Sequence, residues 1–480
     1  MVKTLTIPLD QIKAEICLRS YFEFFKEFWG VIVPDELILA PHIKIICDKL
    51  QEIAERVIQR QPKKCDLIIN VPPGCSKSTI CTQIFPAWCW AKDPTIKIIS
   101  CSYSATLSTQ HAVKSRDVLR SDKFQKYYGN KVTFKEDSDN KTLYENNQGG
   151  MRASTSVGGT ITGMHAHIIL IDDPINPQQA ASANARNTAN EFIGSTLFTR
   201  KVDKKITPTI LIMQRLHEKD ATGFLLGRNN QIEHICLPAE LSVNVKPVEL
   251  KAIYTDGLLD PQRMDHATLA ENKKALGSYA YAGQFDQKPA PDEGGLIKKG
   301  WFKKISYLDY KNIPGSGTVN FFLDTAYTNK QKNDPTALMA CDYINNILYI
   351  LASEQVWKEL PDLLKHIPSF VTKNDYTTRS RILIEPKASG KSTAQSFKNS
   401  TYNVIELPAP VDDKTTRVSN VSPFIEAGRC IIVEGPWNDN FLHEAGVFPN
   451  GEHDDQVDNL VNAINYYNRV IFKKPITSNT

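Results

Sequence analysis

Two groups of residues in this chain have the types and spacing that phosphate chemistry needs. The first is the stretch Val71-Pro-Pro-Gly-Cys-Ser-Lys-Ser-Thr79, which follows an apolar run and leads into a helical pattern over 79–90. In such a loop, backbone N–H groups and the helix N-terminus face phosphate oxygens, with Lys77 on the β- and γ-phosphates and Ser78 on Mg²⁺. The sequence therefore indicates an ATP-binding loop, whose binding residues are Gly74, Cys75, Ser76, Lys77, Ser78 and Thr79.

The loop departs from the usual G-x-x-x-x-G-K-S pattern, because Val71 and Ser76 stand where the two glycines would be. Taken alone, the stretch has a second interpretation as a solvated Gly-Pro turn. The choice between them depends on what lies elsewhere in the chain.

A second stretch, His167-Ile-Ile-Leu-Ile-Asp-Asp-Pro174, has the pattern of a buried strand that ends in two carboxylates. Ligands of parallel sheets bind where the strands end, so we expect Asp172 beside the loop as a Mg²⁺ ligand. Asp173 would orient or deprotonate the attacking water. The alternative is that Asp-Asp-Pro only caps a helix after a core strand. Together with the lysine loop, the pair favours an NTPase.

A third strand candidate, Thr209–Met213, is followed by the polar run Gln214-Arg-Leu-His-Glu-Lys-Asp220. We expect Gln214 to contact the nucleotide and to sense the γ-phosphate; a charged helix start is the alternative. Arg116 and Arg152 are the candidates for an arginine finger that stabilises charge on the transferred phosphate.

The second group consists of acids in the C-terminal part of the chain. Asp324 ends the apolar run Phe321–Leu323, Glu385 ends the run Ile382–Ile384, and His453-Asp-Asp-Gln-Val-Asp458 opens the last helical pattern. Carboxylates at neighbouring strand ends can share divalent metals that activate water and stabilise the leaving oxygen in phosphodiester hydrolysis. Single strand-end acids are more often caps or turn residues, but three sets in the order strand, strand, helix favour a metal site.

The arrangement of the expected elements separates these two groups into different domains. Strand patterns at 67–71, 96–100, 167–171 and 209–213 alternate with helical stretches, which predicts an α/β domain with a parallel sheet flanked by helices at residues 1–245. Prolines and the Gly294–Gly295 pair predict a connecting segment at 246–310. Further strand patterns at 319–323, 337–342, 347–352 and 381–384 and a helix at 455–467 predict a second α/β domain at 311–480.

Composition excludes several other classes of protein. Hydrophobic residues make up 41% and charged residues 23% of the chain, which is ordinary for a globular protein. Its apolar runs fall far short of the ~20 residues of a membrane span, and we expect no signal peptide and a cytosolic location. The ten cysteines form no metal or disulfide pattern and are expected to be reduced core residues. The net charge of +4 decides nothing about nucleic acid.

With these residues in view, the chain resembles the large terminase subunit of tailed bacteriophages. The resemblance rests on the ATP-binding loop, the strand-end acids and several phrases of sequence: Gly158-Gly-Thr-Ile-Thr-Gly163, Met213-Gln-Arg-Leu-His-Glu218, Ala282-Gly-Gln-Phe-Asp-Gln-Lys-Pro289 and Phe448-Pro-Asn-Gly-Glu-His-Asp-Asp-Gln-Val-Asp458. It implies an N-terminal P-loop ATPase and a C-terminal ribonuclease H-like nuclease.

The resemblance also assigns roles to individual positions. Lys77, Ser78 and Asp172 match the family's phosphate and Mg²⁺ residues, and Asp173 stands where many relatives have glutamate. Asp324 and Glu385 match the first two nuclease acids, which bind Mg²⁺ or Mn²⁺. For the third acid we favour Asp455 or Asp454 over Asp458. Pro41-His42 lies in a suitable place for the adenine contact.

The implied function is a motor that uses ATP to move double-stranded DNA into a procapsid and a two-metal nuclease that cuts concatemeric DNA. The implied partners are double-stranded DNA, a portal protein, a small terminase subunit and further copies of the chain in a ring on the procapsid, with a monomer possible in solution. The implied place is the host cytoplasm, at the portal. A helicase or repair ATPase with an attached nuclease, and a DNA-binding scaffold with degenerate sites, are the alternatives.

Overall fold

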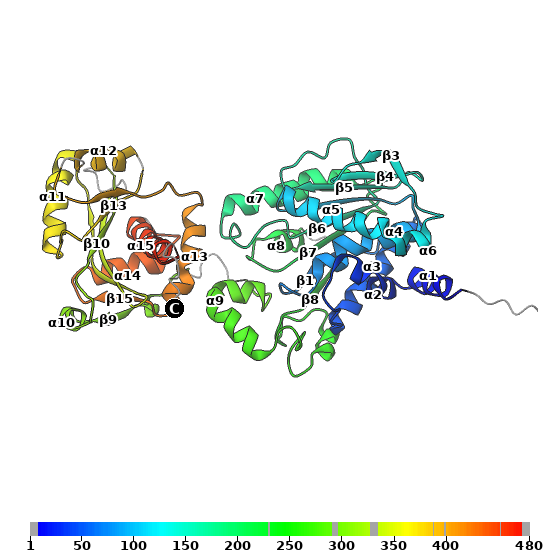
Figure 1. Cartoon of the computed structure of the whole chain (residues 1–480), viewed down its shortest axis with the longest axis horizontal. Coiled ribbons are helices and arrows are strands. Elements are labelled where there is room, and N and C mark those ends of the chain that lie inside the picture. Colours follow the sequence, from blue (N-terminus) through cyan, green and yellow to red (C-terminus); the bar gives the residue numbers. More distant parts are fainter. Residues whose placement is uncertain are drawn as a thin grey trace, which may run out of the picture. The chain divides into compact units, whose positions relative to one another are not determined.

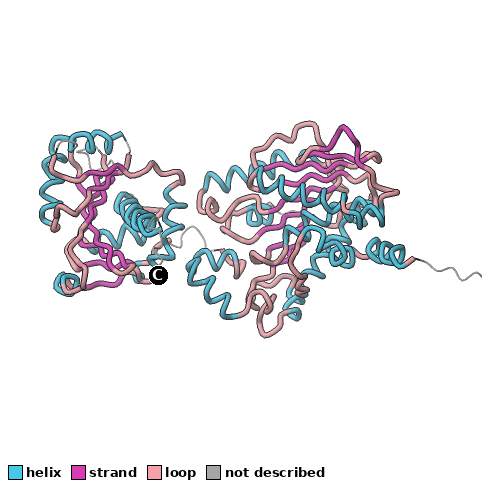
Figure 2. The backbone as a smooth tube through the Cα atoms, viewed as in Figure 1, coloured by secondary structure: helices cyan, strands magenta, loops and turns pink. Residues whose placement is uncertain are grey.

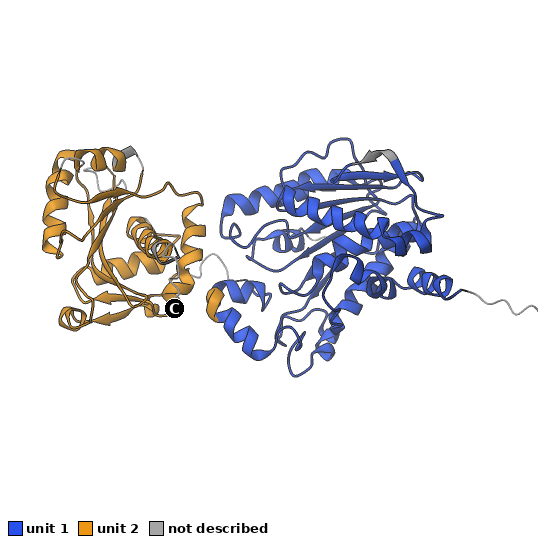
Figure 3. Cartoon of the chain, viewed as in Figure 1, with its two compact units in different colours: residues 1–273, 278–291 blue, residues 274–277, 292–480 orange. Residues whose placement is uncertain are grey.

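The chain folds into two compact units, residues 1–273 with 278–291 and residues 274–277 with 292–480 (Figure 3). The computed structural model describes residues 8–228, 231–289, 296–326, 335–386, 388–397, 400–451 and 453–472. Within these ranges, every helix lacks the length or the apolar character needed to cross a membrane.

The first unit is an α/β domain that begins with three helices. Its helices are α1 (Leu9–Arg19), α2 (Tyr21–Ile32), α3 (Pro41–Ile58), η1 (Thr79–Ile84), α4 (Phe85–Lys92), α5 (Ala105–Arg120), α6 (Asp122–Tyr128), α7 (Ala183–Glu191), η2 (Phe192–Thr196), η3 (Leu197–Arg200), α8 (Ala221–Leu226), η4 (Val248–Ile253) and α9 (His266–Gln284). Its strands are β1 (Asp66–Asn70), β2 (Lys97–Ser102), β3 (Phe134–Asp139), β4 (Leu143–Asn146), β5 (Met151–Ser156), β6 (Ile168–Asp172), β7 (Thr209–Met213) and β8 (Ile232–Cys236).

These strands form one eight-stranded sheet in the order β3-β4-β5-β2-β6-β7-β1-β8 (Figure 1). All pairs from β5 to β8 are parallel, whereas β4 pairs antiparallel with both β3 and β5. Strand β7 therefore lies between β1 and β6. The loop that follows β1 and the acids that end β6 emerge at the same edge of the sheet, one strand apart.

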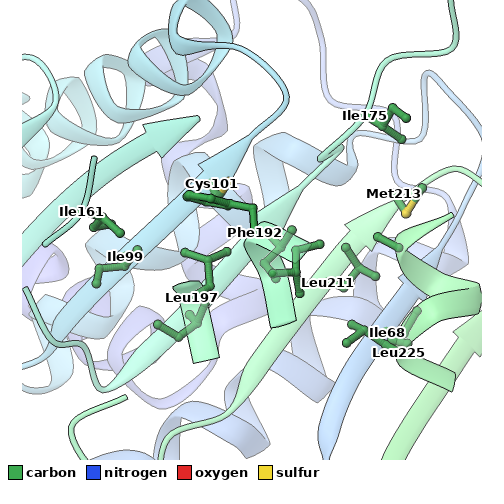
Figure 4. Packing of buried hydrophobic residues seen from close by; sticks show 14 of the residues in the cluster. Ile68, Ile99, Cys101, Ile161, Ile175, Phe192, Leu197, Leu211, Met213 and Leu225 are labelled. Atoms are coloured by element: carbon green, nitrogen blue, oxygen red, sulfur yellow. The ribbon is translucent and has the colours of Figure 1, made fainter. Parts of the chain in front are cut away.

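Helical segments cover both faces of this sheet, which explains why its strands are apolar on both sides. Alternate strand residues, such as Ile99 and Leu211, pack in one cluster with Phe192 and Leu197 (Figure 4), and Ile169 belongs to the same cluster. The side chains between them face η1 and α5 on the other side. Because Asp172 comes three residues after Ile169, strand alternation directs it to the η1 and α5 face.

The second unit is a smaller α/β domain. Its elements are η5 (Lys299–Trp301), β9 (Lys303–Ile305), α10 (Tyr307–Lys311), β10 (Asn320–Asp324), β11 (Thr336–Ile344), β12 (Ile347–Val356), α11 (Leu360–Lys373), β13 (Ile382–Ile384), α12 (Ala388–Phe397), β14 (Val404–Glu406), α13 (Lys414–Glu426), β15 (Cys430–Val433), α14 (Asn438–Val447) and α15 (Asp455–Phe472). Figure 2 shows the strands as one continuous sheet with helices around it.

This sheet is seven-stranded and mixed, in the order β14-β13-β10-β11-β12-β15-β9. Strands β10, β11 and β12 pair antiparallel, while β13 and β14 add in parallel beside β10. Phe321, Leu323 and Ile384 belong to the core that α11 and α12 cover. Helix α15 packs against β10 and β11. By alternation, Asp324 and Glu385 lie on the α15 face of the sheet.

The expected strands and the final helix are confirmed, and most of the boundaries agree to within one or two residues. The structure adds strands that carry weak periodicity in the sequence, namely β3, β4, β5, β8, β9, β14 and β15. All ten cysteines are free, and all but Cys65 are buried, as expected.

The segment 246–310 differs from the expected connection between domains. Most of it up to Pro289 belongs to the first unit and carries η4 and α9. It is tied to that unit by hydrogen bonds, for example Ala239 N–H to the Phe285 carbonyl at 2.8 Å and Arg215 N–H to Gln287 Oε1 at 2.9 Å. Pro247 lies in a bend and Pro261 in a turn of this packed segment. Gly294 and Gly295 lie outside the described residues.

The tight turn before α8 generates a prediction about stability. A Cβ added to Gly223 would lie 1.8 Å from the backbone oxygen of Glu218, so that backbone must shift. We expect Gly223→Ala to destabilise the first unit by about 2–3 kcal/mol, as overpacked cores do. Gly30→Ala in α2, where a Cβ meets nothing within 4 Å, is the control and should be neutral or slightly stabilising. Urea unfolding of the two variants and the wild type measures the difference, and equal midpoints would contradict the prediction.

Candidate active sites

The loop between β1 and η1 contains two residues in the left-handed backbone conformation, although its sequence lacks the second glycine of the usual pattern. Gly74 has φ +82° and Ser76 has φ +57°, so Ser76 occupies the left-handed region that a glycine would ordinarily take at this position. An L-residue pays roughly 1–2 kcal/mol for this conformation. The side chain offsets part of that cost, since Ser76 Oγ accepts a hydrogen bond from Arg263 Nη1 at 2.9 Å.

The structure brings the predicted nucleotide residues of the first unit together. Lys77 Nζ lies 3.1 Å from Asp173 Oδ2 and 3.5 Å from Gln214 Oε1. Ser78 Oγ donates to Asp172 Oδ1 at 3.0 Å. Residues from the ends of β1, β6 and β7 thus converge on one place, as expected for a phosphate and Mg²⁺ site at the carboxyl edge of a parallel sheet.

The electrostatics of this cluster depend on burial. Burial raises the pKa of both Asp172 and Asp173, and the ammonium of Lys77 opposes that shift. For Lys77, burial lowers the pKa, but the carboxylates of Asp173 and Asp172 outweigh it and the net shift is upward. A buried cation beside one buried and one half-buried acid favours ligands that bring both phosphate oxygens and a metal ion.

Behind Asp172, a histidine and an arginine complete the cluster. His111 Nδ1 lies 3.3 Å from Asp172 Oδ2. Burial and then Arg152 lower the pKa of His111 to about 4, so the imidazole is neutral at pH 7. Arg152 is 1% exposed and donates to Ser100 Oγ at 2.6 Å and to the Ala153 carbonyl at 2.9 Å. These contacts hold the Arg152 guanidinium in the interior, whereas Arg116 is half-buried, and the choice between them as the arginine finger stays a prediction.

Two residues outside the loop, His42 and Arg263, contact it, and the sequence analysis linked neither of them to the loop. His42, at the start of α3, lies with Nε2 3.2 Å from the Cys75 carbonyl, and burial lowers its pKa to about 4. Arg263 donates to Ser76 Oγ through Nη1, and its Nε lies 2.5 Å from Asp260 Oδ2. No local pattern marks Arg263, because it lies 187 residues from Ser76 in a segment expected to be a connection. The adenine role of Pro41-His42 stays a prediction.

The second unit gathers three acids in its interior. Asp324, Glu385 and Asp458 each offer a carboxylate oxygen, and these oxygens lie within 4.8 Å of one another. All three residues are at most 2% exposed. Burial raises the pKa of Asp458, Lys414 and Arg417 oppose the shift, and Glu385 adds to it. Such a set of buried oxygen donors fits a divalent cation, which would balance their charge.

Of the three acids around the start of the last helix, Asp458, and not the favoured Asp455 or Asp454, is the one that the structure brings together with Asp324 and Glu385. Helix α15 begins at Asp455, and Asp458 follows about one turn later. Asp454 precedes the helix and binds Lys414 Nζ at 2.5 Å.

Helix α13 supplies the cations of this site, which the sequence analysis did not single out. Lys414 Nζ lies 2.7 Å from Asp458 Oδ2, and Arg417 Nη2 lies 2.9 Å from Asp458 Oδ1. The two residues are three positions apart and so share one helix face. That spacing was the available signal, although it occurs on many solvated helices.

The comparisons with known proteins bear on this unit directly. Residues 322–467 match the family described as the terminase RNaseH-like domain. The second unit is a terminase RNase H-like domain. The expected fold class and the resemblance are confirmed over this span, which contains all three acids of the cluster.

Solved structures with low sequence identity cover more of the chain. It is similar to the large terminase of a thermophilic bacteriophage, with 10% identity and a TM-score of 0.46 over 87% of this chain and 98% of that one. It is also similar to the large terminase of bacteriophage HK97, with 12% identity and a TM-score of 0.37 over 89% and 92%. A third similar structure is the large terminase nuclease of thermophilic phage G20c with bound magnesium, with 14% identity and a TM-score of 0.28 over 36% and 98%. No curated protein matches the chain.

The acid cluster of the terminase RNase H-like domain predicts a contrast between two neighbouring aspartates. We expect Asp458→Asn to abolish DNA cleavage in Mg²⁺ or Mn²⁺, because it removes one of the three converging carboxylates. Asp455→Asn, an equally small change three residues earlier, should retain most of the activity. Plasmid nicking by the purified proteins measures both, and loss of cleavage in Asp455→Asn alone would reverse the assignment.

Arg263 generates a prediction for the first unit. Removing its guanidinium takes away the hydrogen bond to Ser76 and leaves the strained loop less well held. We expect Arg263→Ala to raise the KM for ATP about tenfold, the effect of losing one hydrogen bond to a charged group. Arg263→Lys should recover part of that loss, whereas Arg19→Ala, on exposed α1, should change nothing. An unchanged KM in Arg263→Ala would show that the loop keeps its shape unaided.

Proposed function

We propose that this chain is the large subunit of a DNA-packaging terminase, which hydrolyses ATP in its first unit and cuts DNA with its second. One observation carries the proposal: a terminase RNase H-like domain with three converging acids shares a chain with a strand-loop-helix that gathers Lys77, Ser78 and Asp172. Helicase or repair ATPases with an attached nuclease remain the alternative, and the family match weighs against them.

In the first unit, ATP is the substrate and the loop is its cradle. Backbone N–H groups of the loop and the helix start that follows it face the phosphates, while Lys77 neutralises β- and γ-oxygens. Ser78 and Asp172 fit a Mg²⁺ ion, since both are oxygen donors and they already lie 3.0 Å apart. Asp173, on the neighbouring position with φ +43°, orients the attacking water, and Gln214 reports on the γ-phosphate.

In the second unit, Asp324, Glu385 and Asp458 hold divalent metal ions, with Mg²⁺ as the natural occupant and Mn²⁺ as a substitute. Divalent ions bound there would activate a water molecule and stabilise the leaving oxygen of the phosphodiester. The protein supplies the rest: Lys414 and Arg417 fix Asp458, and Asn462 Nδ2 donates to Glu385 Oε2 at 3.2 Å. These contacts hold the acids in place before metal or DNA arrives.

The proposed partners follow from this function. The track is double-stranded DNA, the docking partner is a portal protein on the procapsid, and a small terminase subunit selects the DNA. Several copies of the chain form a ring at the portal in the host cytoplasm, with a monomer as the form in solution. No membrane partner is proposed.

The motor is tested by Lys77→Ala. We expect ATP turnover to fall at least about 100-fold, because the variant loses the charge that stabilises the transferring phosphate. Lys64→Ala, whose side chain is 63% exposed, is the matched control and should behave as the wild type.

Phosphate release is measured with linear DNA and portal-bearing procapsids, and DNA protection from nuclease reports packaging. Near-normal turnover in Lys77→Ala would refute the ATPase assignment. Turnover without any protected DNA in the wild type would refute the packaging role instead.

A further inference from the structure

A cavity of about 390 Å³ lies next to the acid cluster of the second unit, between α13, α15 and the segment 407–412. Its lining includes Arg417 and Asn462, each of which also touches an acid of the cluster. A single side chain therefore separates the cavity from each acid: Arg417 from Asp458, and Asn462 from Glu385. A ligand bound in the cavity therefore lies beside the acid cluster.

The residues of α15 that line the cavity follow a strict helical spacing. Asn462, Asn465, Tyr466 and Arg469 stand at positions i, i+3, i+4 and i+7, and Asp458 stands one turn before them. Residues at this spacing share one face of a helix. A single polar face thus runs from the metal-binding acid into the cavity. Helix α13 faces it with Arg417 and Asn420, which are themselves one turn apart.

The chemistry of the lining matches the parts of a nucleotide. Guanidinium groups such as those of Arg417 and Arg469 bind phosphate, side-chain amides such as that of Asn420 pair with base edges, and an aromatic ring offers a surface on which a base can stack. Tyr466 is held in place at its phenol oxygen by Arg381 Nη1. Leu407 and Pro408 form an apolar wall.

Size and charge narrow the choice of ligand. Pockets that hold one small ligand span roughly 300–1,000 Å³, and a cavity of about 390 Å³ accommodates one nucleotide. Asp412 also lines the cavity. The Asp412 carboxylate repels a free inorganic anion, whereas it can accept hydrogen bonds from the donor groups of a base.

We propose that this cavity binds one unstacked nucleotide of the DNA strand next to the phosphate being cut. The inference rests on the proposed nuclease function for its place in the reaction. Arg469 and Asn420 are the specific binding residues, because both are exposed in the cavity and neither is among the acids or their partners. Asn462 and Arg417 are positioning residues that link the bound nucleotide to Glu385 and Asp458.

The test is binding of a fluorescent eight-residue oligothymidylate to the full chain in Ca²⁺, measured by anisotropy. Ca²⁺ occupies oxygen sites without the strict geometry that Mg²⁺ demands, and so supports binding in place of cutting. Arg469→Ala and Asn420→Ala are the variants, and both change exposed side chains, so folding is preserved. Lys365→Ala on α11, with a side chain that is 80% exposed, is the matched charge control.

We expect Arg469→Ala and Asn420→Ala each to weaken oligonucleotide affinity about tenfold, as the loss of one strong polar contact does. Arg469→Ala should also reduce the slope of affinity against salt by about 0.7, the share of one phosphate contact on a single strand. Lys365→Ala should bind as the wild type. Wild-type affinity in both cavity variants, or an equal loss in Lys365→Ala, would overturn the inference.

Failure of this inference and failure of the nuclease proposal give different results. If the wild type binds the oligonucleotide through Arg469 and Asn420 but cuts no DNA in Mg²⁺ or Mn²⁺, the cavity stands and the nuclease assignment falls. If the wild type cuts DNA while both cavity variants bind normally, the nuclease stands and the cavity assignment falls.

Discussion

Burying carboxylates imposes the constraint that both units must satisfy. An isolated buried charge is costly, and proteins offset that cost with cations, hydrogen bonds or metal ions. In the first unit the loop after β1 brings Lys77 to Asp173. In the second unit α13 brings Lys414 and Arg417 to Asp458. The two units differ in topology, yet in each of them a separate element supplies positive charge to an acid of the cluster.

Strand alternation decides on which face of each sheet the strand-end acids lie. Asp172 follows two residues after Leu170, which faces η1 and α5, and it therefore points away from the core that η2 and η3 cover. Asp324 and Glu385 each come directly after a residue of the α11 and α12 core, Leu323 and Ile384, and so point to α15. A one-residue slip in any of these strands would bury the acid among apolar side chains instead.

The parts of the sites that could be predicted are those encoded by short stretches of sequence. A buried strand and the polar residue that ends it are contiguous, so the sequence alone points to Asp172, Asp324 and Glu385, which the structure places in the two clusters. The choice of Asp458 over Asp455 depends on where α15 starts and on its rotation, and a run with acids at 454, 455 and 458 leaves both open. The position of Arg263 under the loop depends on packing between segments 187 residues apart, to which no local pattern is sensitive.

One face of helix α15 carries residues of both the acid cluster and the neighbouring cavity of the second unit. Asp458 belongs to the acid cluster, Asn462 touches Glu385, and Arg469 lines the cavity, all from one face of one helix. Because an α-helix turns about 100° per residue, a shift of one position would remove all three from their places together. Asn459 Nδ2 donates to the Ala337 carbonyl of β11 at 2.9 Å, and Tyr467 stacks on Tyr343 with ring centroids 4.6 Å apart. These contacts with β11 lie on a different side of the helix from the cavity-lining face, and they fix the rotation on which both the acid cluster and the cavity depend.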